Sequence, residues 1–281
     1  LIMAVIQLGA LKLKAAADKL PCDLDVLLST DPEMASEVIS GSFGGKSLNE
    51  YIKAHKGCLG SRAQDGDDIP FEVKILSNAA DGLVQVNAYP NQDSLWYILD
   101  AVPGAEIGYG FKEGMTPERI AAGIAANTLA ADLNRIPVKT GDVVKLKSGT
   151  VYSLAKGVTI LEIQNEMYEQ NPQANVLDLI TLEPVKHNHT VGEWVDDGQA
   201  KRGNMGKIDT FDADLYALNG RLTVDADEKT FRILIVTEGS AVIESGDEIL
   251  HAEQNSVFFA PANGEPFNMT GNCRFVMVIL A

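Results

Sequence analysis

The sequence predicts a mainly β protein: two barrels of one type, with a few helices in or around the N-terminal half. Most of its apolar segments are short and are separated by turns that contain Gly, Asp and Asn, and only two segments carry helix starts. Short strands at this spacing are typical of β-sandwiches and barrels. A repeat is also visible, because residues 141–149 and 254–262 both read as a polar turn, a strand and a small-residue turn. We therefore expect two copies of one barrel.

The two helix starts lie at Ser47 and Thr116. Ser47 is followed three residues later by Glu50, the arrangement of a capping box, which predicts a short helix. Thr116 precedes Pro117, which suits the first helical position, and an apolar stripe then runs to about Arg135. We therefore expect a second and longer helix between residues 117 and 135.

Strands are expected in two groups, one on each side of an irregular stretch. The first group comprises residues 71–76, 83–89, 96–99, 143–146 and 158–163. The second comprises residues 232–236, 241–244, 248–250, 256–260 and 275–280, with turns at 237–240 and 245–247. Between them, residues 168–212 are rich in Asn, Pro, Gly and charge. The predicted organisation is an N-terminal barrel domain over 1–167, a linker over 168–212 and a C-terminal barrel domain over 213–281.

Composition narrows the class of partner. The chain has 281 residues and a net charge of −16, which would repel nucleic acid and an anionic membrane surface. No apolar run is long enough for a transmembrane helix, and the first ten residues lack the pattern of a signal peptide. The three cysteines, Cys22, Cys58 and Cys273, form no CxxC pair, so we expect reduced thiols in a cytoplasmic protein. The sequence carries no indication of oligomeric state.

Several segments, in order along the chain, resemble one enzyme family. Residues 71–76 read FEVKIL, residues 84–87 read VQVN, and residues 96–105 read WYILDAVPGA. Further along are IGYGFK at 107–112, SGTVYSL at 148–154 and LEIQ at 161–164, then VTEGSAVI at 236–243 and FAPA at 259–262. These motifs resemble those of the type I mannose-6-phosphate isomerases, which belong to the cupin superfamily. The resemblance covers the chain from about residue 25 to its end, apart from the expected linker.

The resemblance implies a fold, a cofactor and a reaction. The fold would be two cupin (jelly-roll-like) barrels, and the reaction would interconvert mannose 6-phosphate and fructose 6-phosphate. In that family a zinc ion in the first barrel is held by Gln, His, Glu and His. A divalent metal beside the two sugar oxygens stabilises the negative charge that develops as a proton moves between C1 and C2.

The expected zinc site is largely missing. Matching the motifs residue by residue, Gln85 retains the family's Gln, whereas Asn87 and Tyr152 stand where the family has His. Ser94 stands where the family has Glu, two residues before the Trp. Neutral amide, hydroxyl and phenol groups are poor zinc ligands compared with imidazole and carboxylate. We therefore expect zinc to be absent or weakly bound.

Three lysines are candidates for holding a phosphate. Lys74 persists from the family motif, and Lys145 and Lys147 alternate along a predicted strand. Together they would form a local basic patch, which a phosphorylated ligand needs in so acidic a chain. The alternative is an ordinary charged strand face and a barrel lysine whose stem packs against apolar surface.

A second possible metal site lies in the expected linker. His187, His189 and Glu193 read HxHxxxE, a spacing that many cupins use for a metal. The run lies far upstream of the Gly239 turn that should follow it closely, so we interpret it as a solvated segment. No nucleotide-binding loop or nucleophile motif is present, which leaves nucleotide and acyl-transfer chemistry without support.

Three functional hypotheses follow. The first is a mannose-6-phosphate isomerase homologue that has lost most metal-dependent catalysis and only binds a sugar or sugar phosphate. The second is a working aldose–ketose isomerase with a rearranged metal site. The third is a non-catalytic structural or partner-binding protein.

Overall fold

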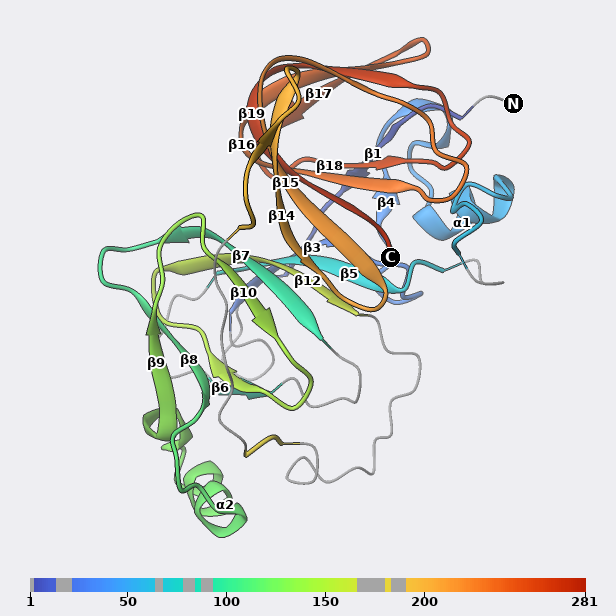
Figure 1. Cartoon of the computed structure of the whole chain (residues 1–281). Coiled ribbons are helices and arrows are strands. Elements are labelled where there is room, and N and C mark those ends of the chain that lie inside the picture. Colours follow the sequence, from blue (N-terminus) through green and yellow to red (C-terminus); the bar gives the residue numbers. More distant parts are fainter. Residues whose placement is uncertain are drawn as a thin grey trace. The chain divides into compact units, whose positions relative to one another are not determined.

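The structure is a computed structural model that describes residues 3–13, 22–63, 68–77, 84–86, 93–165, 180–182 and 191–281, with only the backbone of 84–86 (Figure 1). It confirms a mainly β protein. Its described α-helices are α1 (Leu48–Ala54) and α2 (Pro117–Ala125), both in the N-terminal half. Neither they nor any other helix in these ranges has the length and apolar character needed to cross a bilayer.

The helix starts are confirmed, whereas one helix end is not. The Ser47 side chain accepts a hydrogen bond from the Glu50 backbone and Glu50 bonds back, so α1 has the expected capping box. Thr116 likewise caps α2, with Pro117 in its first turn. The expected extension of α2 to about Arg135 is wrong. Asn127 has a left-handed φ of 53°, which ends the helix, and the chain continues as a 3₁₀ turn η2 (Leu129–Asp132) and a strand.

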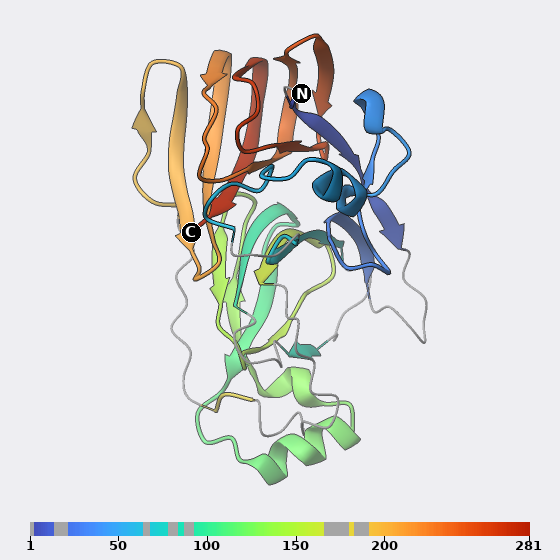
Figure 2. The same cartoon turned by 90° about the vertical axis from the view of Figure 1, so that its right-hand side faces the viewer.

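The chain divides into two compact units: Leu1–Leu11, Val26–Glu72 and Val191–Ala281 in one, and Lys12–Asp25 and Val73–Thr190 in the other. The first contains a nine-stranded sheet, which we call the second barrel. Figure 2 shows its long strands side by side. The strands are β1 (Ile6–Gly9), β4 (Glu37–Val38), β13 (Val195–Asp196), β14 (Ala200–Lys207), β15 (Phe211–Val224), β16 (Arg232–Ser245), β17 (Glu248–Glu253), β18 (Val257–Ala260) and β19 (Phe267–Leu280).

Two pairings within this sheet depart from the expected domain limits. Strand β1 pairs with β18, with Ile6 opposite Phe259, so the N-terminal residues cluster with the C-terminal barrel. Strands β13 and β14 lie inside the stretch expected as a linker, and β14 pairs with β15 along its whole length. Sheet pairing joins segments far apart in sequence, whereas composition reports only local character. The Gly and charged residues of β14 therefore led to the prediction of a linker where the structure has a strand.

The predicted turn at residues 237–240 is wrong. β16 continues through it as one strand of 14 residues, with a bulge between Val236 and Glu238. Gly239 makes the bulge possible. Its φ is 74°, and a Cβ there would lie 2.2 Å from the carbonyl oxygen of Asn272. The turn expected at 245–247 is confirmed, because it joins β16 to β17.

The other unit holds most of a six-stranded sheet, in the order β10-β7-β12-β5-β3-β2, and a four-stranded sheet, in the order β6-β11-β8-β9. We call it the first barrel. Buried apolar side chains from both sheets form its interior core. The strands are β2 (Leu11–Leu13), β3 (Asp23–Leu28), β5 (Phe71–Ser77), β6 (Val84–Val86), β7 (Ser94–Ala101), β8 (Glu106–Phe111), β9 (Leu133–Pro137), β10 (Val143–Leu146), β11 (Val151–Ser153) and β12 (Val158–Asn165).

The predicted repeat is visible in the backbone. Strands β10 and β18 each have four residues and each follow a residue with a left-handed φ: Gly141 at 92° and Asn255 at 68°. Each is followed three residues after its end by another, Gly149 at 80° and Asn263 at 57°. The strands they pair with, β7 and β16, also share a bulge. The two barrels therefore contain one repeated unit.

Candidate active site

The candidate site is the polar part of the first barrel's interior. Trp96 on β7 and Tyr152 on β11 belong to the buried core between the two sheets. Glu162 on β12 lies opposite Trp96 in the strand register and is also buried. Side chains opposite each other in adjacent strands point to the same face of a sheet, so the Glu162 carboxyl group shares the interior with Trp96.

Trp96 connects the other two side chains. Its indole Nε1 donates a hydrogen bond of 2.8 Å to Oε1 of Glu162. Its ring meets the Tyr152 ring edge-on, with centroids 4.7 Å apart and planes at 86°. Such T-shaped aromatic pairs are favourable beyond the area they bury. The three side chains therefore form one contiguous buried group that we call the Trp96 cluster: Trp96, Tyr152 and Glu162.

Two acidic groups in this interior, the Tyr152 phenol and the Cys22 thiol, have raised pKa values. Burial, reinforced by the nearby Glu162 carboxylate and then by Cys22, raises the pKa of the Tyr152 phenol well above 10.0. Burial, again with Glu162 beside it, also raises the pKa of the Cys22 thiol. Loss of either proton would place a second negative charge near Glu162 in a medium of low dielectric. At neutral pH both groups therefore stay neutral.

The positions matched to zinc ligands can now be placed. Gln85 lies opposite Tyr152 in the pairing of β6 with β11, so the two backbones are neighbours. Ser94 is fully buried at the start of β7, where it lies opposite Gln164 of β12. Asn87 is outside the described residues. The structure thus brings Gln85, Ser94 and Tyr152 to strands of the same barrel.

The described residues do not fit a zinc ion. A buried phenol with a raised pKa is a neutral oxygen, whereas zinc sites use imidazole, thiolate or carboxylate. Ser94 adds only a hydroxyl group, and the carboxylate that is present, Glu162, is bonded to the indole of Trp96. Within the described ranges, no group of three or more His, Cys, Asp or Glu side chains could hold a metal.

The second barrel provides an internal reference, because its repeated strands have equivalent positions. Trp96 pairs with Val144 of β10, as Leu234 pairs with Phe258 of β18. Trp96 also pairs with Glu162, and Leu234 with Met277. The pair Trp96–Glu162 therefore corresponds to Leu234–Met277, an apolar contact. A hydrogen-bonded indole and carboxylate is therefore not a requirement of this barrel type.

The three candidate lysines lie in different surroundings. Lys74 on β5 is half-buried and alternates with Leu76, a member of the interior core, so it faces the interior. Lys145 lies between Val144 and Leu146, which are both core residues, and so faces the other side of its sheet. Lys147 is exposed and its Nζ pairs with Oδ2 of Asp93 at 2.6 Å. The structure does not gather the three into one patch.

The other sequence candidate is only partly visible. His187 and His189 lie outside the described residues, and Glu193 is exposed. Glu162 and Trp96 lie within the family-like motifs of the sequence, but the sequence alone did not place either residue in the site. A signal was present for Glu162, because a carboxylate stands between apolar residues in the predicted strand 158–163. Buried carboxylates are rare without a partner.

No protein-family model matches the chain. Its sequence is 25% identical over 273 residues to mannose-6-phosphate isomerase ManA of Bacillus subtilis, covering 86% of this chain and 84% of that protein. It is 36% identical over 148 residues to a mannose-6-phosphate isomerase of Streptococcus mutans, covering 49% of this chain and 46% of that protein.

The fold is matched by a solved structure. The crystal structure of a mannose 6-phosphate isomerase from Bacillus subtilis superposes with a TM-score of 0.80 at 21% identity, covering 98% of this chain and 99% of that one. This likeness confirms the expected double-cupin fold. Along most of its length the chain is thus similar, in sequence and in fold, to mannose-6-phosphate isomerases.

Proposed function

We propose that this chain has lost the metal-dependent isomerase reaction and keeps the first barrel as a binding site for a sugar phosphate. The observation that carries the proposal is the environment of Tyr152. Its phenol stands at the position matched to a zinc-ligating His, is buried, and packs edge-on against Trp96. A neutral phenol there takes the place of a metal ligand and fills space beside the indole.

The consequence for the reaction is electrostatic. An aldose–ketose conversion develops negative charge on the sugar oxygens as the proton leaves carbon. A divalent metal supplies several kcal/mol of stabilisation for such charge. A neutral phenol, amide and hydroxyl offer hydrogen bonds but no positive charge. Without the metal we therefore expect the isomerisation to be slower by many orders of magnitude.

Binding of a sugar phosphate does not require a metal ion. Lys74 is the described cation on the interior face, next to core residue Leu76, and can attract a phosphate group. Glu162, Trp96 and Tyr152 give the same interior a carboxylate, an indole and a phenol. The proposed ligand is a hexose phosphate, held without turnover.

Metal analysis and a coupled assay test the proposal. Protein purified without added metal should carry well under one zinc per chain, and added zinc should give no isomerisation of mannose 6-phosphate above background. A turnover of about 1 per second or more would contradict the proposal, since it lies in the usual enzymatic range. Near-stoichiometric zinc that resists dialysis would instead support a working isomerase with a rearranged metal site.

Calorimetric titration with mannose 6-phosphate and fructose 6-phosphate tests the binding part. The expected result is saturable binding that weakens in Lys74→Ala and is retained in Lys145→Ala, whose side chain faces away from the interior. If neither sugar phosphate binds at millimolar concentration, a structural or partner-binding role becomes the better explanation.

A further inference from the structure

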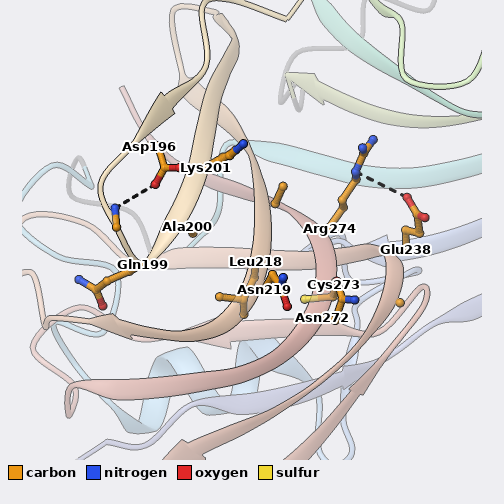
Figure 3. Close-up of a pocket in the computed structure, with 13 residues that line it drawn as sticks. Asp196, Gln199, Ala200, Lys201, Leu218, Asn219, Glu238, Asn272, Cys273 and Arg274 are labelled. Atoms are coloured by element: carbon orange, nitrogen blue, oxygen red, sulfur yellow. Dashed lines mark hydrogen bonds and ion pairs between the residues drawn. The ribbon is translucent and has the colours of Figure 1, made fainter.

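A cavity of about 640 Å³ lies in the second barrel (Figure 3). Its walls come from β14, β15, β19 and β16, which are neighbours in the sheet in that order, and from the β13–β14 hairpin. Volumes of a few hundred to a thousand Å³ are typical of small-molecule sites. The cavity is thus a hollow across one sheet face, of a size that suits a small ligand.

The strand register identifies which face is hollowed. Lys201 lies opposite Ala217, Ala217 opposite Arg274, and Arg274 opposite Glu238, so these four form one row across the sheet. Asn219 and Asn272, two residues along, face each other on the same side. The residues between the rows, such as Leu218 and Cys273, point the other way, into the barrel core. The cavity therefore presents polar side chains, away from the barrel interior.

The bulge in β16 places one of these groups. Thr237 is the extra residue, and its hydroxyl bonds to the Arg274 carbonyl at 3.2 Å. The bulge sets Glu238 opposite Arg274, and their side chains pair at 3.6 Å. In the first barrel the equivalent bulge sets Asp100 opposite Thr159, with no such pair. Both barrels therefore have the bulge, whereas the ion pair at the cavity wall is found at this position of the second barrel.

Several polar groups in the cavity are available to a ligand. Asn219 and Asn272 are exposed, and among the described residues their amides have no hydrogen-bond partner. Within the same part of the chain, the Lys201 ammonium has no ion pair either. Asp196, which lies opposite Lys201 in the pairing of β13 with β14, is fixed, since its Oδ1 accepts a hydrogen bond of 3.0 Å from the Gly198 backbone. Figure 3 shows the two amides close together, with Asp196 and Lys201 to one side and Arg274 and Glu238 to the other.

We propose that this cavity binds a neutral polyhydroxylated ligand, a sugar or a short oligosaccharide. Each amide presents a donor and an acceptor, as vicinal hydroxyl groups require. Lys201 and Arg274 are balanced by Asp196 and Glu238, so the lining favours neither anions nor cations. The site is separate from the proposed sugar-phosphate site in the first barrel.

The test is an NMR titration of the ¹⁵N-labelled full chain with neutral disaccharides, namely maltose, cellobiose and mannobiose. Inorganic phosphate is titrated in a parallel arm. At least one disaccharide should bind saturably at millimolar concentration and shift the Asn219 and Asn272 signals. The double variant Asn219→Leu/Asn272→Leu should bind it about tenfold more weakly or worse, since it loses hydrogen bonds without losing volume. Thr270→Val, an exposed change on β19 outside the cavity, should bind as the wild type does.

Three results would overturn the proposal: no saturable disaccharide binding, unchanged binding by the double variant, or phosphate binding at this cavity in place of the sugars. Lys74→Ala separates the two proposed sites. It should leave disaccharide binding unchanged while weakening sugar-phosphate binding in the first barrel. A loss of disaccharide binding in Lys74→Ala would assign that binding to the first barrel instead. Far-UV circular dichroism and thermal unfolding of each variant establish that the fold is intact.

Discussion

Trp96 and Glu162, on neighbouring strands of the first barrel, share a buried hydrogen bond of 2.8 Å between indole Nε1 and carboxylate Oε1. Their equivalents in the second barrel, Leu234 and Met277, pack as an apolar pair. A barrel of this type is therefore stable without the polar contact. Its presence in the first barrel gives that barrel a polar group in an otherwise apolar core position.

The hydrogen bond can be measured by a double-mutant cycle. Trp96→Phe removes the indole donor and leaves the buried Glu162 carboxylate one partner short, so we expect unfolding to become easier by about 1–3 kcal/mol or more. Glu162→Gln keeps an acceptor oxygen and should cost less. Urea denaturation of both variants and of their combination gives the coupling energy, expected to be at least about 0.5 kcal/mol. Strictly additive effects would show that the contact contributes nothing.

The bulge in β16 predicts a specific glycine requirement. Gly239→Ala should destabilise the protein strongly, because it combines a left-handed φ of 74° with a Cβ placed 2.2 Å from the Asn272 carbonyl oxygen. Gly45→Ala is the matched control, since its φ is 84° and nothing lies within 4 Å of the added Cβ. Thermal unfolding should show a clearly larger loss for Gly239→Ala. Equal losses would mean that backbone conformation alone sets the cost.

Local signals in the sequence predicted much of the fold. The Ser47–Glu50 capping box and the strand at 143–146 are found where expected, because caps and alternation are properties of neighbouring residues. The pairing of Ile6 with Phe259 could not be predicted, because no local pattern encodes a partner more than 200 residues away. The strand through Gly239 was missed for a related reason. A bulge and a turn use the same residues, and only the partner strand distinguishes them.

In the candidate site, too, local motifs were predictable from the sequence and long-range contacts were not. The departures at Ser94 and Tyr152 came from matching motifs, and the structure places both side chains in the buried interior. Whether lysines gather around a ligand depends on which face of each strand they occupy. Lys145 was a candidate to join Lys74 or to lie on an ordinary charged strand face, and its neighbours Val144 and Leu146 take the interior face. The Trp96–Glu162 contact required the register of two strands, which the sequence alone did not supply.

Tyr152 should make stability fall at high pH. Its phenol pKa is raised in the folded protein by burial and by Glu162, whereas the unfolded chain titrates near the ordinary value of 10.0. The folded state then holds a proton that the unfolded state releases, so stability is full below about pH 10 and is lost as pH rises toward the folded pKa. Urea denaturation of Tyr152→Phe should show a shallower decline above that pH than the wild type. Parallel declines would contradict a buried, protonated phenol.

The proposed loss of the metal site should be reversible by substitution. The triple variant Asn87→His, Ser94→Glu, Tyr152→His restores the imidazoles and the carboxylate of the family pattern around Gln85. We expect it to bind zinc near one equivalent per chain, measured by elemental analysis after dialysis. Zinc should also raise its unfolding temperature, because a metal that binds only the folded state stabilises that state.

A matched control separates ligand chemistry from changes in packing. The variant Asn87→Gln, Ser94→Gln, Tyr152→Phe alters the same three positions with neutral groups, so it should gain neither zinc nor thermal stabilisation by zinc. Ser94 is fully buried, so Ser94→Glu introduces a carboxylate that needs the metal as its counter-charge. The triple variant should therefore be less stable than the wild type without zinc and recover when zinc is added. If it folds and binds no zinc, the matching of Asn87, Ser94 and Tyr152 to the ligand positions is wrong.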